Sequence, residues 1–153
     1  AKAFGCEIAV CRRHPADGQT NLTLPELFET SDIISLHTPL NEQTLHSVNR
    51  DVLKHAAKKP ILINAARGAV VDEEAVACAV ESGLLSGFAT DVYEGEPMRA
   101  DSPLRRLAGR DNVLFTPHMA WGAYEARKRL IEEVYRNIEV FLNGETRSRV
   151  DCL

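Results

Sequence analysis

The sequence lacks the patterns that define several classes of protein. No run approaches the about 20 apolar residues of a membrane-spanning helix, so we expect no membrane partner. The net charge is −4 and no basic block occurs, which argues against nucleic acid as the main partner. The four cysteines, at 6, 11, 78 and 152, show neither CxxC nor zinc spacing. We therefore expect reduced thiols, a cytoplasmic location and no metal centre.

A glycine-rich GxGxxG phosphate loop is also absent from the sequence. The composition is otherwise that of a folded protein, with 44% hydrophobic and 26% charged residues. A length of 153 residues allows one domain with a real core and is short for two.

The order of predicted elements indicates an α/β fold. Strands are expected over 7–10, 32–37, 60–64, 86–92 and 112–116. Between them, Thr23 and Glu26 predict a capping box for a short helix, Asn49 caps a helix reaching about residue 58, and Asp72 caps one that stops near Gly83. Helical spacing also predicts a turn over 104–107 and a long amphipathic helix over 124–142.

Strands alternating with helices predict a doubly wound parallel sheet, Rossmann-like in type. The run at 61–63 is apolar throughout, as in a strand covered on both faces. Residues 1–122 are expected to form part of a dinucleotide-binding domain, and residues 123–153 a C-terminal helix and tail.

Polar side chains follow three of the predicted strands. Arg67 comes after one strand, Asp91, Glu94 and Glu96 after the next, and His118 after the last. Carboxyl ends of parallel strands share an edge, where open α/β sheets bind ligands. A guanidinium, a carboxylate and an imidazole together suit reduction of a 2-keto acid. The alternatives are a surface salt bridge for Arg67, a structural histidine and solvated acidic residues.

Four motifs carry a family resemblance: SLHTPL at 35–40 with Thr44, NAARG at 64–68, DVYEGEP at 91–97 and TPH at 116–118. Together they resemble the D-isomer-specific 2-hydroxyacid dehydrogenases over nearly the whole chain. HMAW at 118–121, followed by EAR at 125–127, is most similar to the glycerate dehydrogenase (hydroxypyruvate reductase) branch. The resemblance implies hydride transfer between NAD or NADP and a 2-keto or 2-hydroxy acid, with hydroxypyruvate or glyoxylate as substrate, by a protein that pairs as a homodimer.

The resemblance also implies roles for individual residues. Arg67 matches the substrate-binding arginine, His118 the catalytic acid/base, and Glu96 the glutamate that pairs with it. Asp91 matches an aspartate near the nicotinamide. The remaining matched positions line the dinucleotide: Thr38, Pro39, Thr44, Ala65 and Ala66.

The sequence departs from the family pattern in two respects. Where NAD-preferring members carry an acidic residue, this chain has Arg12 followed by Arg13, which predicts a preference for NADPH. An exposed arginine pair without a ligand is the alternative. The family's first strand, with its glycine-rich turn, does not occur here. We expect its place to lie between the strands at 7–10 and 60–64, so that the chain on its own would expose unpaired strand edges and be inactive.

Two other functions are compatible with the same motifs. One is an NAD(H)-sensing scaffold like the corepressors of this superfamily, which resemble dehydrogenases at these positions. The other is an inactive truncated remnant. Turnover of hydroxypyruvate or glyoxylate distinguishes an enzyme from both.

Overall fold

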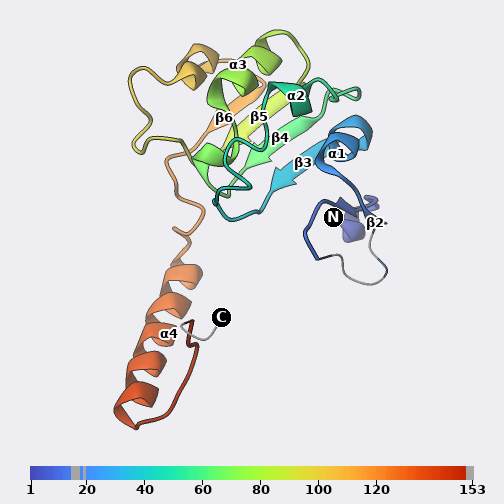
Figure 1. The fold of residues 1–153 in the computed structure, drawn as a ribbon. Helices are drawn as coiled ribbons and strands as arrows, with labels where there is room; N and C mark the ends of the chain where they lie inside the picture. Colours follow the sequence, from blue (N-terminus) through green and yellow to red (C-terminus); the bar gives the residue numbers. More distant parts are fainter. Residues whose placement is uncertain (15–17, 19, 151–153) are drawn as a thin grey trace. The chain divides into compact units, whose positions relative to one another are not determined.

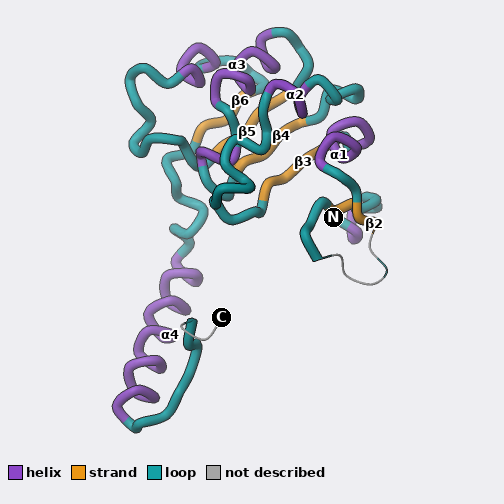
Figure 2. Tube along the Cα trace, viewed as in Figure 1, coloured by secondary structure: helices purple, strands orange, loops and turns teal. Residues whose placement is uncertain are grey.

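The computed structural model describes residues 1–14, 18 and 20–150. The chain forms two compact units: a sheet unit, residues 1–117, and a helix unit, residues 118–153. Figures 1 and 2 show their elements. Pro15 to Asp17, Gln19 and the last three residues, with Cys152, lie outside the described residues. The predicted domain boundary after residue 122 stays a prediction.

The sheet unit alternates strands with short helices. In chain order its elements are η1 (Lys2–Phe4), β1 (Ala9–Val10), β2 (Thr20–Asn21), α1 (Leu24–Thr30), β3 (Ile33–Leu36), α2 (Arg50–Leu53), β4 (Ile61–Asn64), η2 (Gly68–Val70), α3 (Glu73–Glu81), β5 (Gly87–Thr90), η3 (Pro103–Leu107) and β6 (Val113–Phe115).

The main sheet is parallel, with strand order β3-β4-β5-β6. Leu36, Asn64, Thr90 and Phe115 stand beside one another at the carboxyl ends of its four strands. Helices connect the successive strands, as parallel pairing requires. The predicted α/β class with a Rossmann-like parallel sheet is confirmed.

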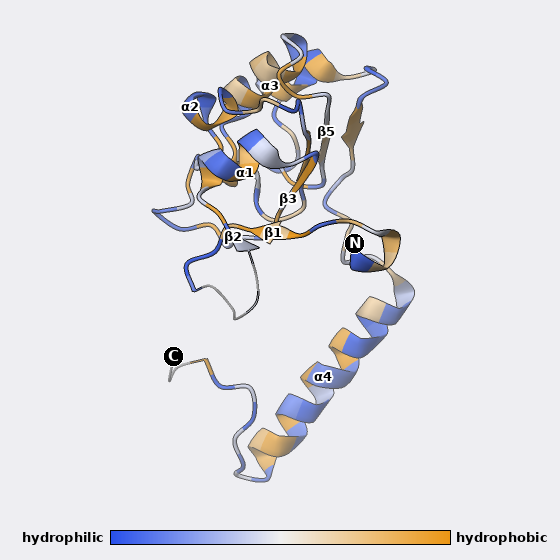
Figure 3. Cartoon of the chain, turned by 90° about the vertical axis from the view of Figure 1, so that its right-hand side faces the viewer, coloured by the Kyte–Doolittle hydropathy of each residue, from blue (hydrophilic) through white to orange (hydrophobic). Residues whose placement is uncertain are grey.

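The core lies on one face of this sheet, under α1, α2 and α3 (Figure 3). Phe28 of α1 and Leu53 of α2 are buried there with Leu62 and Phe88 of the sheet. On the opposite face Ile33 and Leu114 are both 61% exposed, and Ile61 is 40% exposed. The expectation that the 61–63 run is covered on both faces is therefore wrong for the sheet unit.

Local capping signals of the sequence are reproduced. Thr23 and Glu26 form the capping box of α1, and the Asp72 side chain accepts the Ala75 N–H at 3.0 Å at the start of α3. The helix after Asn49 is shorter than expected and ends at Leu53, not near residue 58. From His55 on, the backbone bonds span three residues or fewer, as the chain turns towards β4, so the α-helical pattern stops.

The first strand differs from the prediction. It is shorter than 7–10, and β1 pairs in parallel with β2, a strand that was not predicted. These two strands form a sheet of their own, so the predicted single sheet is wrong in this region. β4 is paired on both sides, by β3 and β5, which contradicts the predicted place for a further strand beside 60–64. The reason is that β3 and β4 are consecutive strands of the main sheet, linked through α2, and consecutive strands are usually neighbours.

The helix unit contains α4 (Tyr124–Leu142), with the bounds that the sequence predicted. Hydrophobic and hydrophilic residues are interspersed along it (Figure 3). Gly144, at φ 72°, follows it in the left-handed conformation that glycine adopts without strain. Among the described residues, no helix combines the length and apolar character needed to cross a membrane.

Candidate active site

Arg67 lies just past the carboxyl end of β4, on a turn shaped by Asn64. The buried Asn64 side chain accepts the Ala66 N–H at 3.1 Å through Oδ1 and donates through Nδ2 to the Arg67 carbonyl at 3.0 Å. The exposed guanidinium donates to the Ala66 carbonyl at 2.6 Å. No ion pair of Arg67 occurs within residues 1–14, 18 and 20–150.

Gly68 brings the Arg67 turn against the chain that follows β5. A Cβ added at Gly68 would lie 1.8 Å from the Tyr93 carbonyl carbon and 2.3 Å from the Glu94 nitrogen. Only a residue without a side chain allows two backbone segments to lie this close. The turn bearing Arg67 is therefore in direct contact with the segment that leads to Glu96.

The carboxyl ends of β5 and β6 are joined by polar contacts. The buried Asp91 carboxylate accepts from the Thr116 hydroxyl at 2.5 Å, and the Tyr93 hydroxyl donates to the Thr116 carbonyl at 2.8 Å. Burial, and then the charges of Asp91, Glu96 and Glu73, raise the pKa of Tyr93 above its ordinary value. The phenol therefore stays protonated and remains a donor near neutral pH.

The three acidic residues after β5 have different partners. Asp91 binds Thr116, while Glu96, which is exposed, accepts the Tyr93 N–H at 3.1 Å. The Glu94 carboxylate lies 3.3 Å from Nε2 of His46, a residue that sequence reasoning did not single out. Spacing gave no signal for that pair, because 48 positions separate the two residues (94 − 46).

His118 is the first residue of the helix unit, where it has a left-handed backbone with φ 52°. The Trp121 indole N–H donates to the His118 carbonyl at 2.7 Å, and the Gly122 N–H donates to the Met119 carbonyl at 2.8 Å. These bonds close a tight turn around the histidine. His118 lies in the helix unit, whereas Arg67 and Glu96 lie in the sheet unit. The pairing of His118 with these two residues stays a prediction.

Most of the predicted cofactor-lining residues lie after β3 and β4. Thr38 is half-buried and Pro39 is exposed after β3, where the Thr44 hydroxyl donates to the Pro39 carbonyl at 2.6 Å. Ala65 is exposed and Ala66 half-buried after β4. The two sets of residues thus follow adjacent strands of the sheet, and their contact with a dinucleotide stays a prediction.

Arg12 and Arg13 follow β1 and are both exposed. The Arg12 N–H donates to the Asn21 side chain at 3.2 Å, and the Arg13 guanidinium donates to Gln43. Asn21 and Gln43 are contacts that sequence reasoning missed.

Residues 1–120 match the family described as D-isomer specific 2-hydroxyacid dehydrogenase, NAD binding domain. The chain belongs to this family, as the sequence motifs predicted. It is 43% identical over 122 residues to a glyoxylate reductase of Thermofilum pendens, a match that covers 80% of this chain and 35% of that protein. It is 34% identical over 152 residues to a glycerate dehydrogenase of Methylorubrum extorquens, with 99% and 48% covered.

Solved structures give the same relationship. The chain resembles D-lactate dehydrogenase from Aquifex aeolicus, complexed with NAD and lactic acid, with a TM-score of 0.84, 31% identity, and 94% and 48% of the two chains covered. It also resembles the NADPH-dependent glyoxylate/hydroxypyruvate reductase from Sinorhizobium meliloti, with a TM-score of 0.82, 33% identity, and 92% and 44% covered. The chain thus spans half or less of the length of these relatives.

Proposed function

We propose that the protein carrying this chain is an NAD(P)-dependent D-2-hydroxyacid dehydrogenase that reduces glyoxylate or hydroxypyruvate. The observation that carries this proposal is Arg67, an exposed cation without an ion pair among the described residues, held by Asn64 at the carboxyl edge of the sheet. The names of the relatives support the choice of substrate.

The proposed chemistry divides among three side chains. Arg67 binds the substrate carboxylate through its planar fork and polarises the neighbouring carbonyl. The His118 imidazolium donates a proton to the carbonyl oxygen as a hydride reaches the carbon, so the carbonyl group becomes an alcohol. Glu96 stabilises the protonated imidazole and fixes its orientation. The bound nicotinamide cofactor supplies the hydride, and residues after β3 and β4, Ala65 and Ala66 among them, would hold it.

The steady-state test uses the full-length protein with hydroxypyruvate or glyoxylate and reduced cofactor. His118→Ala is expected to lower kcat by at least about 100-fold. Arg67→Ala is expected mainly to raise KM for the keto acid. His55→Ala, which changes an exposed histidine after α2, is the control and should leave both constants unchanged. Ordinary kinetics after both site changes would refute the proposal, and no turnover of either acid by the unaltered protein would favour a cofactor-sensing scaffold.

Arg12 supports a preference for NADPH, because a guanidinium beside the adenine ribose can bind a 2′-phosphate. Arg12→Asp is expected to reverse the ratio of kcat/KM for NADPH and NADH. An unchanged ratio in Arg12→Asp would leave Arg12 as an exposed arginine without a ligand.

The remaining expectations belong to the same proposal. Pairing as a homodimer predicts twice the protomer mass in sedimentation. A cytoplasmic location agrees with Cys6, Cys11 and Cys78, which are free thiols in the structure. That the 153-residue chain alone lacks turnover stays a prediction.

A further inference from the structure

Glu73 is a buried carboxylate that the proposed chemistry does not use. It is the first residue of α3 and is only 6% exposed. A charged side chain is rarely buried without partners, because removal from water is costly. The positive end of α3 and the hydrogen bonds to the side chain offset this cost. The contacts of Glu73 therefore indicate its role.

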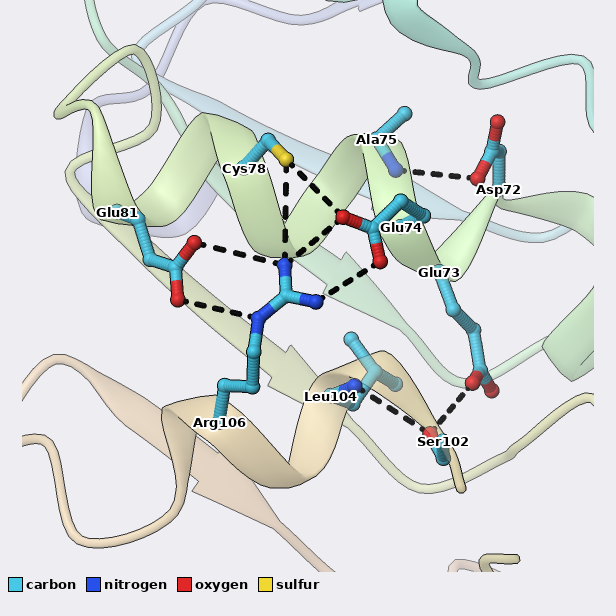
Figure 4. Close-up of polar contacts among 9 residues, drawn as sticks. All are labelled: Asp72, Glu73, Glu74, Ala75, Cys78, Glu81, Ser102, Leu104 and Arg106. Atoms are coloured by element: carbon cyan, nitrogen blue, oxygen red, sulfur yellow. Dashed lines mark hydrogen bonds and ion pairs between the residues drawn. The ribbon is translucent and has the colours of Figure 1, made fainter.

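Both carboxylate oxygens of Glu73 accept from the loop between β5 and η3. Oε1 accepts the Glu94 N–H at 2.9 Å, and Oε2 accepts the Ser102 hydroxyl at 2.6 Å. Ser102 in turn accepts the Leu104 N–H at 3.3 Å and so caps η3, as Figure 4 shows. One side chain thus holds the loop near its start and at its end.

Glu96 lies between these two anchor points, and Gly68 packs against the same segment. The Glu96 carboxylate accepts the Tyr93 N–H, one residue before the amide that Glu73 binds. Gly68 places the Arg67 turn against the backbone of Tyr93 and Glu94. The backbone of Glu94 is therefore held between the Arg67 turn and the Glu73 carboxylate.

We propose that Glu73 is a positioning residue that fixes the Glu96 loop against the turn carrying Arg67. This inference rests on the proposed function, since it gives Glu96 a part in the reaction. Glu73 touches neither substrate nor cofactor in this account. It acts by fixing the position of the Glu96 side chain. A displacement of about 1 Å in a catalytic group can lower turnover by about 100-fold.

Glu74 offers a matched control on the same turn of α3. Its exposed carboxylate binds Arg106 of η3 with contacts of 2.9 and 3.0 Å, and Arg106 also pairs with Glu81 (Figure 4). Glu74 therefore also joins α3 to η3, yet it makes no bond to the segment around Glu96. A general loosening of α3 from η3 would affect both variants, whereas loss of loop position would affect only Glu73.

The experiment is a double-mutant cycle in the full-length protein. Glu73→Ala is expected to lower kcat about 10- to 100-fold, with KM for the cofactor within about twofold. Glu73→Gln, whose amide oxygen can still accept the Glu94 N–H, is expected to recover most of kcat. Glu74→Ala should stay within about twofold of wild type. Hydrogen exchange of peptides spanning 94–102 should accelerate in Glu73→Ala and not in Glu74→Ala.

The combination with Glu96→Ala decides whether Glu73 acts through Glu96. If it does, the double variant has the kcat of Glu96→Ala alone, because Glu96→Ala removes the carboxylate that Glu73→Ala would displace. The inference would be overturned if the fold-losses in kcat of the two single variants multiplied in the double variant, or if Glu73→Ala kept the wild-type kcat. A wild-type kcat in Glu96→Ala would instead refute the proposed role of Glu96. If Glu73→Ala does not fold, Ser102→Ala takes its place in the double-mutant cycle, because it removes one of the two hydrogen bonds to Glu73.

Discussion

Replacing Gly68 with alanine should strongly destabilise the sheet unit. The added Cβ would lie 1.8 Å from the Tyr93 carbonyl carbon, 2.0 Å from its oxygen and 2.3 Å from the Glu94 nitrogen, all backbone atoms that cannot rotate away. Ordinary contact begins at 3.4 Å, so the two segments must separate by about 1.6 Å (3.4 − 1.8). That shift also strains the bond from the Glu94 N–H to Glu73.

We expect Gly68→Ala to lower the free energy of unfolding by about 3 kcal/mol or more, since overpacking and a weakened charged hydrogen bond act together. Urea unfolding followed by circular dichroism measures this change. Gly95→Ala is the control, because its Cβ would meet only the flexible Arg99 side chain, at 2.5 Å, and should cost less than about 1 kcal/mol. A Gly68→Ala variant within about 0.5 kcal/mol of wild type would refute the close contact.

Three further changes test other parts of the sheet unit. Phe28→Ala should cost about 3–5 kcal/mol, because this side chain is fully buried, and a loss under 1 kcal/mol would contradict that burial. Thr23→Ala should cost about 1 kcal/mol in urea unfolding through loss of the α1 cap, and an unchanged midpoint would count against the capping box. Arg106 lowers the pKa of Glu74 below 4.5, so their pairing stabilises the fold above that pH and is lost as pH falls through the lowered pKa. Arg106→Gln should therefore lower the melting temperature slightly at neutral pH and progressively less in acid; an equal loss at both would contradict the pairing.

Features set by neighbouring residues could be predicted from the sequence. The Asp72 and Thr23 caps depend on side chains that reach only three positions along the chain, and α4 follows from an apolar period within one helix. The position of Arg67 follows from the same kind of local pattern, a strand, a turn and a capped helix.

Features that depend on distant partners could not be predicted. Glu73 reads as an ordinary acidic residue of a first helical turn, yet its partners lie 21 and 29 positions further on. The β1 and β2 pairing joins two-residue strands too short for any periodic signal. Exposure of Ile61 depends on what covers the sheet, which an apolar run does not specify.

The turn at His118 carries its own optical probe. Trp121 is the single tryptophan of the chain, and its indole N–H is bonded to the His118 carbonyl. Indole emission depends on the polarity and hydrogen bonding around the ring, so the fluorescence of Trp121 reports on this turn without a label. Titrating keto acid or cofactor while recording that emission would follow the conformation of the histidine segment separately from catalysis.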